Sequence, residues 1–222
     1  ESDKEQFDYQ KALKFYIEAI EECQKLNVDP ISDEYTGIEL KIAEMYEKLN
    51  LVEQANAVYL ELLYRYFDAL NTPAKIPEDK RPDMIRRDLR VLIKSLEVQS
   101  LDASNDVSVG RRNLLAHLLL AQEEVLSRSP ELKSFFENRK QKAKNMFQGK
   151  ALDASDFETF VNTENIKLND DGYMILDLQK NSSAWEPFKE EFFTARDLYT
   201  AFCLSGKDVA AALSCKMTTV EW

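Results

Sequence analysis

The feature that most constrains this chain is a pattern of small and aromatic residues, at helical spacing, that occurs twice near its start. The two copies share separations of four and three residues: Ala12, Tyr16 and Ala19, then Ala55, Tyr59 and Leu62. Residues three and four apart lie on one face of an α-helix. A small residue lets two helices approach closely, and the next large residue fills the space beside it. The pattern therefore predicts helices packed in tight antiparallel pairs.

This spacing is typical of the tetratricopeptide repeat, a helix–turn–helix unit in which a small residue is followed four residues later by an aromatic one. The second copy is preceded by a matching first helix, with Ile42, Ala43 and Tyr46 at its repeat positions. Stacked repeats form extended concave surfaces that hold other polypeptides. The pattern therefore favours a binding protein over an enzyme.

We predict a mostly all-α fold, in which tetratricopeptide-like antiparallel helix pairs form a short solenoid with a small β-hairpin insertion. Only five Gly and six Pro occur in 222 residues, which disfavours a turn-rich all-β fold. We expect four segments along the chain: tetratricopeptide-like repeats in 1–70, further, degenerate helical pairs in 71–147, an insertion with a hairpin in 148–187, and a C-terminal repeat-like helix pair in 188–222.

Hydrophobic periodicity predicts the individual helices. They are expected at about 8–25, 33–49, 52–70, 84–98, 107–127 and 130–147, with a last pair around 192–202 and at 209–220. Ser32 or Asp33 is expected to cap the second helix. The repeat residues are expected to be buried together at one junction: Ala12, Tyr16, Ala19, Ile42, Ala43, Tyr46, Ala55 and Tyr59.

The insertion is predicted from apolar residues that alternate on either side of the dipeptide Asp171-Gly172. These residues are Ile166, Leu168, Tyr173 and Ile175. Alternation around an Asp-Gly pair is a strong signal for a β-hairpin. We therefore expect two short strands, with Asp171-Gly172 at the tip between them.

Charge is unevenly distributed along the chain. The net charge is −11, which argues against a nucleic-acid-binding protein. Residues 1–70 carry net −9, residues 71–150 net +5 and residues 151–222 net −7. The basic middle segment either binds an acidic partner or faces the acidic ends of the same chain, and the sequence leaves both possibilities open.

No catalytic residue, metal ligand or cofactor site is predicted. His117 is the only histidine and lies among leucines, which is typical of a core histidine. The cysteines have no metal-binding spacing and are widely scattered: Cys23, Cys203 and Cys215. Asn169-Asp170-Asp171-Gly172 resembles part of a calcium loop, but Lys167 would then take the first ligand position.

The candidate binding residues lie on the helix predicted at 33–49. Leu40 is about 200° round the helix from the buried Ile42. Charged residues share its exposed side, which gives five candidate partner-binding residues: Leu40, Lys41, Glu44, Glu47 and Lys48. An exposed leucine among charges either contacts an apolar segment of a partner or is an ordinary surface leucine. The carboxylates on this face argue against a groove that grips a terminal carboxylate.

The residues from Asp33 to Leu49 also resemble a specific family. The segments Asp33-Glu34-Tyr35-Thr36-Gly37-Ile38 and Lys41-Ile42-Ala43-Glu44-Met45-Tyr46-Glu47-Lys48-Leu49 are similar to fungal mitochondrial tetratricopeptide proteins that act as substrate adaptors of the inner-membrane i-AAA protease. The resemblance implies a non-enzymatic adaptor that binds unfolded or damaged polypeptides. It also implies that the adaptor delivers them to the protease alongside a second adaptor subunit.

The same resemblance implies a place in the cell. We expect a mitochondrial presequence and one membrane helix upstream of Glu1, with this domain facing the intermembrane space from the inner membrane. The longest apolar stretch in the chain, Leu114–Ala121, is too short to span a bilayer. An alternative function is a scaffold that assembles a mitochondrial inner-membrane complex, because the same groove would hold a folded partner.

Overall fold

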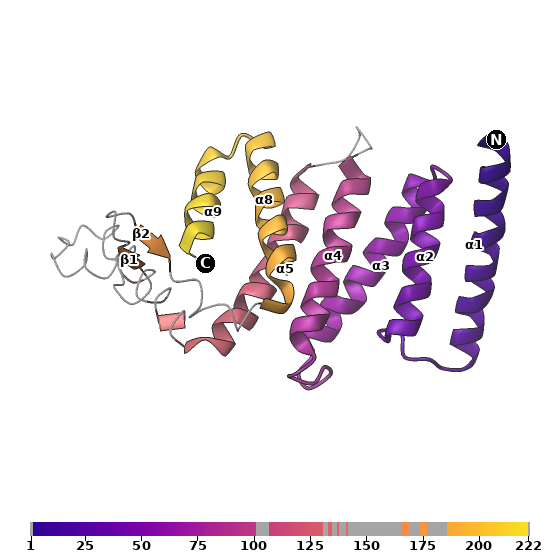
Figure 1. Ribbon diagram of the computed structural model, residues 1–222, viewed down its shortest axis with the longest axis horizontal. Coiled ribbons are helices and arrows are strands. Elements are labelled where there is room, and N and C mark those ends of the chain that lie inside the picture. The colour runs from indigo at the N-terminus through magenta and orange to yellow at the C-terminus, as the bar shows by residue number, and fades with distance from the viewer. Residues whose placement is uncertain are drawn as a thin grey trace. The chain divides into compact units, whose positions relative to one another are not determined.

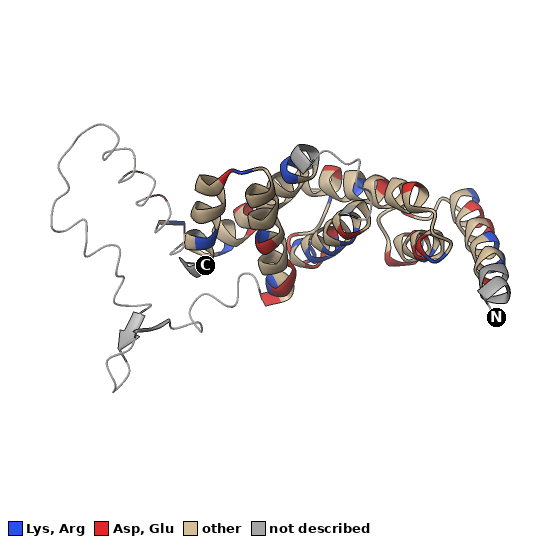
Figure 2. Cartoon of the chain, turned by 90° about the horizontal axis from the view of Figure 1, so that it is seen from above, with Lys and Arg blue, Asp and Glu red and all other residues tan. Residues whose placement is uncertain are grey.

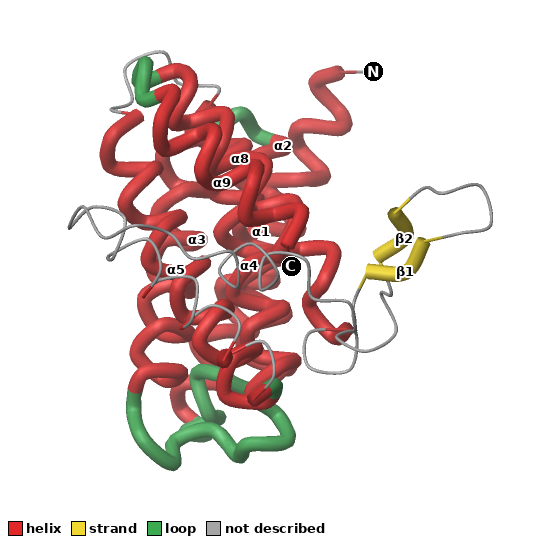
Figure 3. The backbone as a smooth tube through the Cα atoms, turned by 90° about the vertical axis from the view of Figure 1, so that its left-hand side faces the viewer, coloured by secondary structure: helices red, strands yellow, loops and turns green. Residues whose placement is uncertain are grey.

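A computed structural model of the protein describes residues 2–100, 107–130, 133–134, 137, 141, 166–168, 174–176 and 186–221. The chain divides into two compact units, one formed by 1–119 with 188–222 and the other by 120–187. Most of the described backbone is helical (Figure 3), which confirms the mostly α-helical fold class.

The first three helices are α1 (Ser2–Lys25), α2 (Asp33–Lys48) and α3 (Val52–Asn71). Ser32 caps α2, because its Oγ accepts a hydrogen bond from the backbone N–H of Tyr35 at 3.3 Å. Asn50 has a φ of 58°, the left-handed conformation that ends a helix. The predicted limits of α2 and α3 agree with these limits to within one residue.

The next pair is α4 (Arg81–Ser100) and α5 (Val107–Arg128). Helix α4 begins three residues before the predicted start at Met84. Pro82 lies in its first turn. The N–H groups there have no acceptor within the helix, so a proline, which lacks the N–H, costs no hydrogen bond. The predicted helix therefore omits the first turn of α4. The helix predicted at 130–147 falls almost wholly outside the described residues.

The C-terminal pair begins with a 3₁₀ turn, η2 (Glu186–Phe188), and continues as α8 (Lys189–Ser205) and α9 (Val209–Glu221). The tight connection between the two helices contains Lys207, whose φ is 59°. Helix α8 runs beside α9 (Figure 1). It also packs against α4, which lies far away in the sequence. Phe188 and Phe192 are fully buried.

Within the unit formed by 1–119 and 188–222, helices that follow one another pack side by side: α1 on α2, α2 on α3 and α3 on α4. The predicted junction is buried in part, at Ile42, Ala43, Ala55 and Tyr59. The other predicted members are half-buried, namely Ala12, Tyr16, Ala19 and Tyr46. For the three residues of α1, the physical reason is that α1 packs chiefly on α2 and is therefore covered along one side.

His117 is a core histidine, as predicted. Its Nδ1 lies 2.6 Å from Oδ2 of Asp88, and the ring of Phe67 packs against the imidazole with centroids 4.9 Å apart. Asp88 is fully buried. Burial raises the pKa of the Asp88 carboxyl above its usual value, and the hydrogen bond and charge of His117 act in the opposite direction. The pair joins α4 to α5 through the core.

The unit formed by 120–187 contains two short strands, β1 (Ile166–Leu168) and β2 (Met174–Leu176). They pair antiparallel, with Ile166 opposite Leu176 and Leu168 opposite Met174. The second strand therefore begins one residue after the predicted Tyr173. Asp171-Gly172 lies outside the described residues, so its place at a hairpin tip stays a prediction.

Candidate functional site

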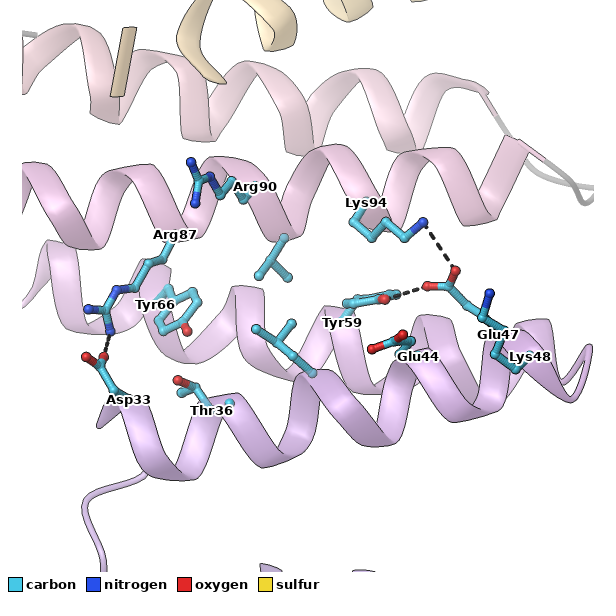
Figure 4. A pocket seen from close by; sticks show the side chains of 13 residues that line it. Asp33, Thr36, Glu44, Glu47, Lys48, Tyr59, Tyr66, Arg87, Arg90 and Lys94 are labelled. Atoms are coloured by element: carbon cyan, nitrogen blue, oxygen red, sulfur yellow. Dashed lines mark hydrogen bonds and ion pairs between the residues drawn. The ribbon is translucent and has the colours of Figure 1, made fainter. Parts of the chain in front are cut away.

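A pocket of about 680 Å³ lies between α2, α3 and α4 (Figure 4). Seven of its lining residues come from α2, two from α3 and four from α4. They are Asp33, Thr36, Gly37, Leu40, Glu44, Glu47 and Lys48, then Tyr59 and Tyr66, then Arg87, Arg90, Val91 and Lys94. On each helix the lining residues recur at separations of three, four and seven, as expected for one helical face.

The floor of the pocket is aromatic and apolar. Tyr59 and Tyr66, which are seven residues apart on α3, are both buried, and so is Val91 on α4. Leu40 on α2 is 36% exposed, so that part of its side chain can still be covered by a partner. Apolar surface of this kind releases free energy when it is covered.

The two walls carry opposite charges that pair across the pocket. Asp33 on α2 forms an ion pair with Arg87 on α4 near one end, and Glu47 pairs with Lys94 near the other (Figure 4). Lys94 Nζ lies 3.2 Å from Oε2 of Glu47. Partly exposed pairs of this kind contribute about 0–1 kcal/mol each to stability. Their main consequence is that both ends of the pocket have little net charge.

Glu47 also receives a hydrogen bond from the pocket floor. The hydroxyl of Tyr59 donates to Oε1 of Glu47 over 2.5 Å. Burial, and then the hydrogen bond and charge of Glu47, raise the pKa of Tyr59 well above its usual value. The hydroxyl therefore stays protonated at neutral pH and remains a donor.

Four of the five predicted binding residues line this pocket: Leu40, Glu44, Glu47 and Lys48. Lys41 does not line it, and its Nζ instead lies 2.8 Å from Oε2 of Glu44. That hydrogen bond raises the pKa of Lys41 and lowers the pKa of Glu44. No observation tests whether a partner contacts any of the five, so their role in binding stays a prediction.

Sequence reasoning missed the wall formed by α4. The lining residues of α4 follow the same helical spacing that identified the α2 face. They are Arg87, Arg90, Val91 and Lys94. Hydrophobic periodicity, which predicts this helix, marks its inward side and not its charged side. A second signal was the charge of the middle segment, because three of these four residues are basic.

The described part of the chain lacks a metal-binding cluster. It contains no group of three or more His, Cys, Asp or Glu side chains arranged to hold a metal ion. The cysteines are free thiols, of which Cys203 and Cys215 are buried and Cys23 is half-buried. None of its helices combines the length and apolar character needed to cross a membrane.

The fold is therefore one of helices packed side by side, with a pocket between α2, α3 and α4. Residues 73–222 match the family described as the MGR3 middle domain, and the chain belongs to this family. Since the match begins at residue 73, it includes the α4 wall of the pocket but not α2.

The matches to two relatives from Saccharomyces cerevisiae include all three helices of the pocket. The chain is 63% identical over 222 residues to the "mitochondrial inner membrane i-AAA protease supercomplex subunit MGR3", a match that covers 100% of this chain and 43% of that protein. It is 36% identical over 225 residues to "Protein MRG3-like", covering 99% of this chain and 46% of that protein. The chain therefore spans less than half the length of these relatives. No solved structure matches it significantly.

Proposed function

We propose that this chain is a non-enzymatic adaptor domain that binds unfolded or damaged polypeptides and delivers them to the i-AAA protease of the mitochondrial inner membrane. The observation that carries the proposal is the pocket between α2 and α4, with its aromatic floor and its paired charges. Further support comes from the 63% identical relative, whose name makes it a subunit of that protease's supercomplex.

The chemistry of the pocket favours an apolar segment as ligand. Arg87 and Lys94 are each paired with a carboxylate of α2, so an anionic ligand would have to displace that carboxylate to pair with either of them. An apolar side chain can instead cover Leu40 without breaking any ion pair. At about 25 cal/mol per Å² of buried apolar surface, one leucine contributes a few kcal/mol at most. Binding should therefore be modest and tolerant of sequence, as delivery of diverse substrates requires.

The proposal includes the setting implied by the family resemblance. The helix pairs would act as tetratricopeptide-like repeats that form a short solenoid. A membrane anchor upstream of this segment would hold the domain in the intermembrane space, next to the protease and a second adaptor subunit. The name of the 63% identical relative supports two parts of this setting, the mitochondrial inner membrane and the i-AAA protease complex.

The test is binding of an unfolded model polypeptide to the 222-residue chain. Ribonuclease A that has been reduced and carbamidomethylated stays unfolded and can carry a fluorescent label for anisotropy. We expect Leu40→Glu to weaken binding about tenfold, which corresponds to 1.4 kcal/mol. Glu44→Lys should alter binding less, because its charge lies on one wall of the pocket.

The matched control is Leu60→Glu. Leu60 is 40% exposed, close to the 36% of Leu40, and it does not line the pocket. All variants should keep the wild-type melting temperature to within about 2 °C, since exposed substitutions change stability little. Equal losses from Leu40→Glu and Leu60→Glu would move the binding site away from this pocket.

The assembly scaffold remains the alternative function, because a supercomplex subunit can also hold folded partners. The scaffold alternative predicts that the wild-type chain does not bind unfolded ribonuclease A. It also predicts that the intact protein co-purifies with folded subunits whose complex fails to form when it is deleted. These two results together would contradict the adaptor proposal and support the assembly scaffold.

A further inference from the structure

Gly37 is an unexpected residue for its position. It is the fifth residue of α2 and has an ordinary right-handed helical conformation, so its backbone does not require glycine. Glycine inside a helix is destabilising relative to alanine, because it loses more conformational freedom on folding. A glycine at such a position needs another explanation.

Packing within the described chain does not supply one. Apart from its two chain neighbours and the backbone of its own helix, a Cβ atom added to Gly37 would meet no heavy atom within 4 Å. Gly110 in α5 shows the contrast, since a Cβ there would lie 3.3 Å from Cδ2 of Leu96 and 3.6 Å from the ring of Phe202. Packing therefore accounts for Gly110 but leaves Gly37 without an intramolecular reason.

The location of Gly37 points to a ligand. It lines the pocket, one helical turn from Asp33 on one side and one turn from Leu40 on the other. Without a side chain it leaves the backbone of α2 bare on the pocket wall. Glycine is the usual residue where a ligand must approach a backbone closely.

We propose that Gly37 is the position where a bound polypeptide segment crosses α2 in van der Waals contact with the helix backbone, between the Asp33–Arg87 ion pair and the side chain of Leu40. The inference rests on the proposed function and adds to it a residue that contacts the main chain of the ligand. The main chain of the ligand passes over Gly37, and one of its apolar side chains covers Leu40. Recognition through a main chain suits substrates of unrelated sequence.

The test measures stability and binding in the same variants of the 222-residue chain, with unfolded, carbamidomethylated ribonuclease A as the probe. Gly37→Ala should raise the melting temperature by about 2–4 °C, because a helix glycine is removed where nothing clashes. It should nevertheless weaken binding about threefold. Gly37→Gln, with a longer side chain, should weaken binding by about tenfold or more.

The control is Ala57→Gln, which adds the same side chain at an exposed position of α3 outside the pocket and should leave binding unchanged. If both Gly37 variants bind like the wild type while Leu40→Glu loses affinity, the crossing at Gly37 is wrong and the adaptor proposal stands. If the wild type itself does not bind the probe, both the crossing at Gly37 and the adaptor proposal are wrong. A lowered melting temperature in Gly37→Ala would show a structural role for the glycine and overturn the inference.

Discussion

At the scale of single residues, Tyr59 connects the three helices around the pocket. It is buried on α3, its hydroxyl donates to Glu47 on α2, and Glu47 also pairs with Lys94 on α4. A protonated Tyr59 is needed for this arrangement. Because the folded protein raises the pKa of Tyr59 above the usual value of 10.0, the stabilisation is present below pH 10 and is lost as pH rises above it.

We therefore expect Tyr59→Phe to lower the free energy of unfolding by about 2 kcal/mol at pH 8, since a hydrogen bond to a charged acceptor is lost. The difference in free energy of unfolding between the variant and the wild type should narrow as pH rises above 10. The reason is that Tyr59 then loses its proton in the unfolded wild type but keeps it in the folded one, which lowers the stability of the wild type. Urea unfolding from pH 8 to 11 measures both effects. A difference that stays constant across this range would contradict the role given to the hydroxyl.

The buried pair of Asp88 and His117 leads to a second prediction at this scale. His117→Leu should lower the free energy of unfolding by about 3–5 kcal/mol, because it leaves the buried carboxyl of Asp88 without its partner. The double variant Asp88→Leu with His117→Leu should recover part of that loss. Urea unfolding at pH 7 measures both variants. A double variant less stable than the single one would show that the pair does more than satisfy its own polar atoms.

At the scale of elements, the close approach of α2 and α3 depends on small residues. Ala43 on α2 and Ala55 on α3 are both fully buried, and the two helices pack along their length. A small side chain at each of these positions leaves room for the facing helix, as the repeated sequence pattern predicts.

Ala55→Leu should overpack this junction and lower the free energy of unfolding by about 1–3 kcal/mol. The matched control is Ala57→Leu, two residues away on the exposed side of α3, which should change stability by less than about 0.5 kcal/mol. Thermal melts of both variants make the comparison. A neutral Ala55→Leu would argue against a tight helix pair.

At the scale of the whole molecule, the basic middle segment pairs with both acidic ends. Arg87 and Lys94 pair with carboxylates of residues 1–70, while Arg90 and Arg111 pair with Glu191 and Asp208. Of the two possibilities left open by the sequence, these contacts support a middle segment that faces the acidic ends. Basic and acidic residues are accordingly interspersed on the described helices (Figure 2).

The net charge of −11 should then affect the rate of binding more than its strength. Two unfolded peptides with the same apolar centre, one flanked by Lys and one by Glu, provide the test. At about 20 mM salt the Lys peptide should associate at least about tenfold faster, and near 0.5 M salt the two rates should converge as screening shortens the Debye length. Stopped-flow fluorescence measures the rates. Equal rates at low salt would contradict long-range steering by this chain.

Much of this protein could be predicted from the sequence, because helix formation is local. The limits of α2 and α3, the cap at Ser32 and the buried alanines all follow from residues three and four apart. The exposed face around Leu40 followed from the same periodicity. These features need no knowledge of where distant segments lie.

The tertiary structure decided the rest. Helix periodicity marks a face, but it does not say which distant helix lies opposite that face. The pocket exists because α4 stacks on α3 and brings Arg87 and Lys94 across from Asp33 and Glu47. The same stacking, with α8 against α4, determines which charges pair. Such contacts depend on how the chain closes over long separations, and for that reason only the folded structure shows that Gly37 borders open space instead of another helix.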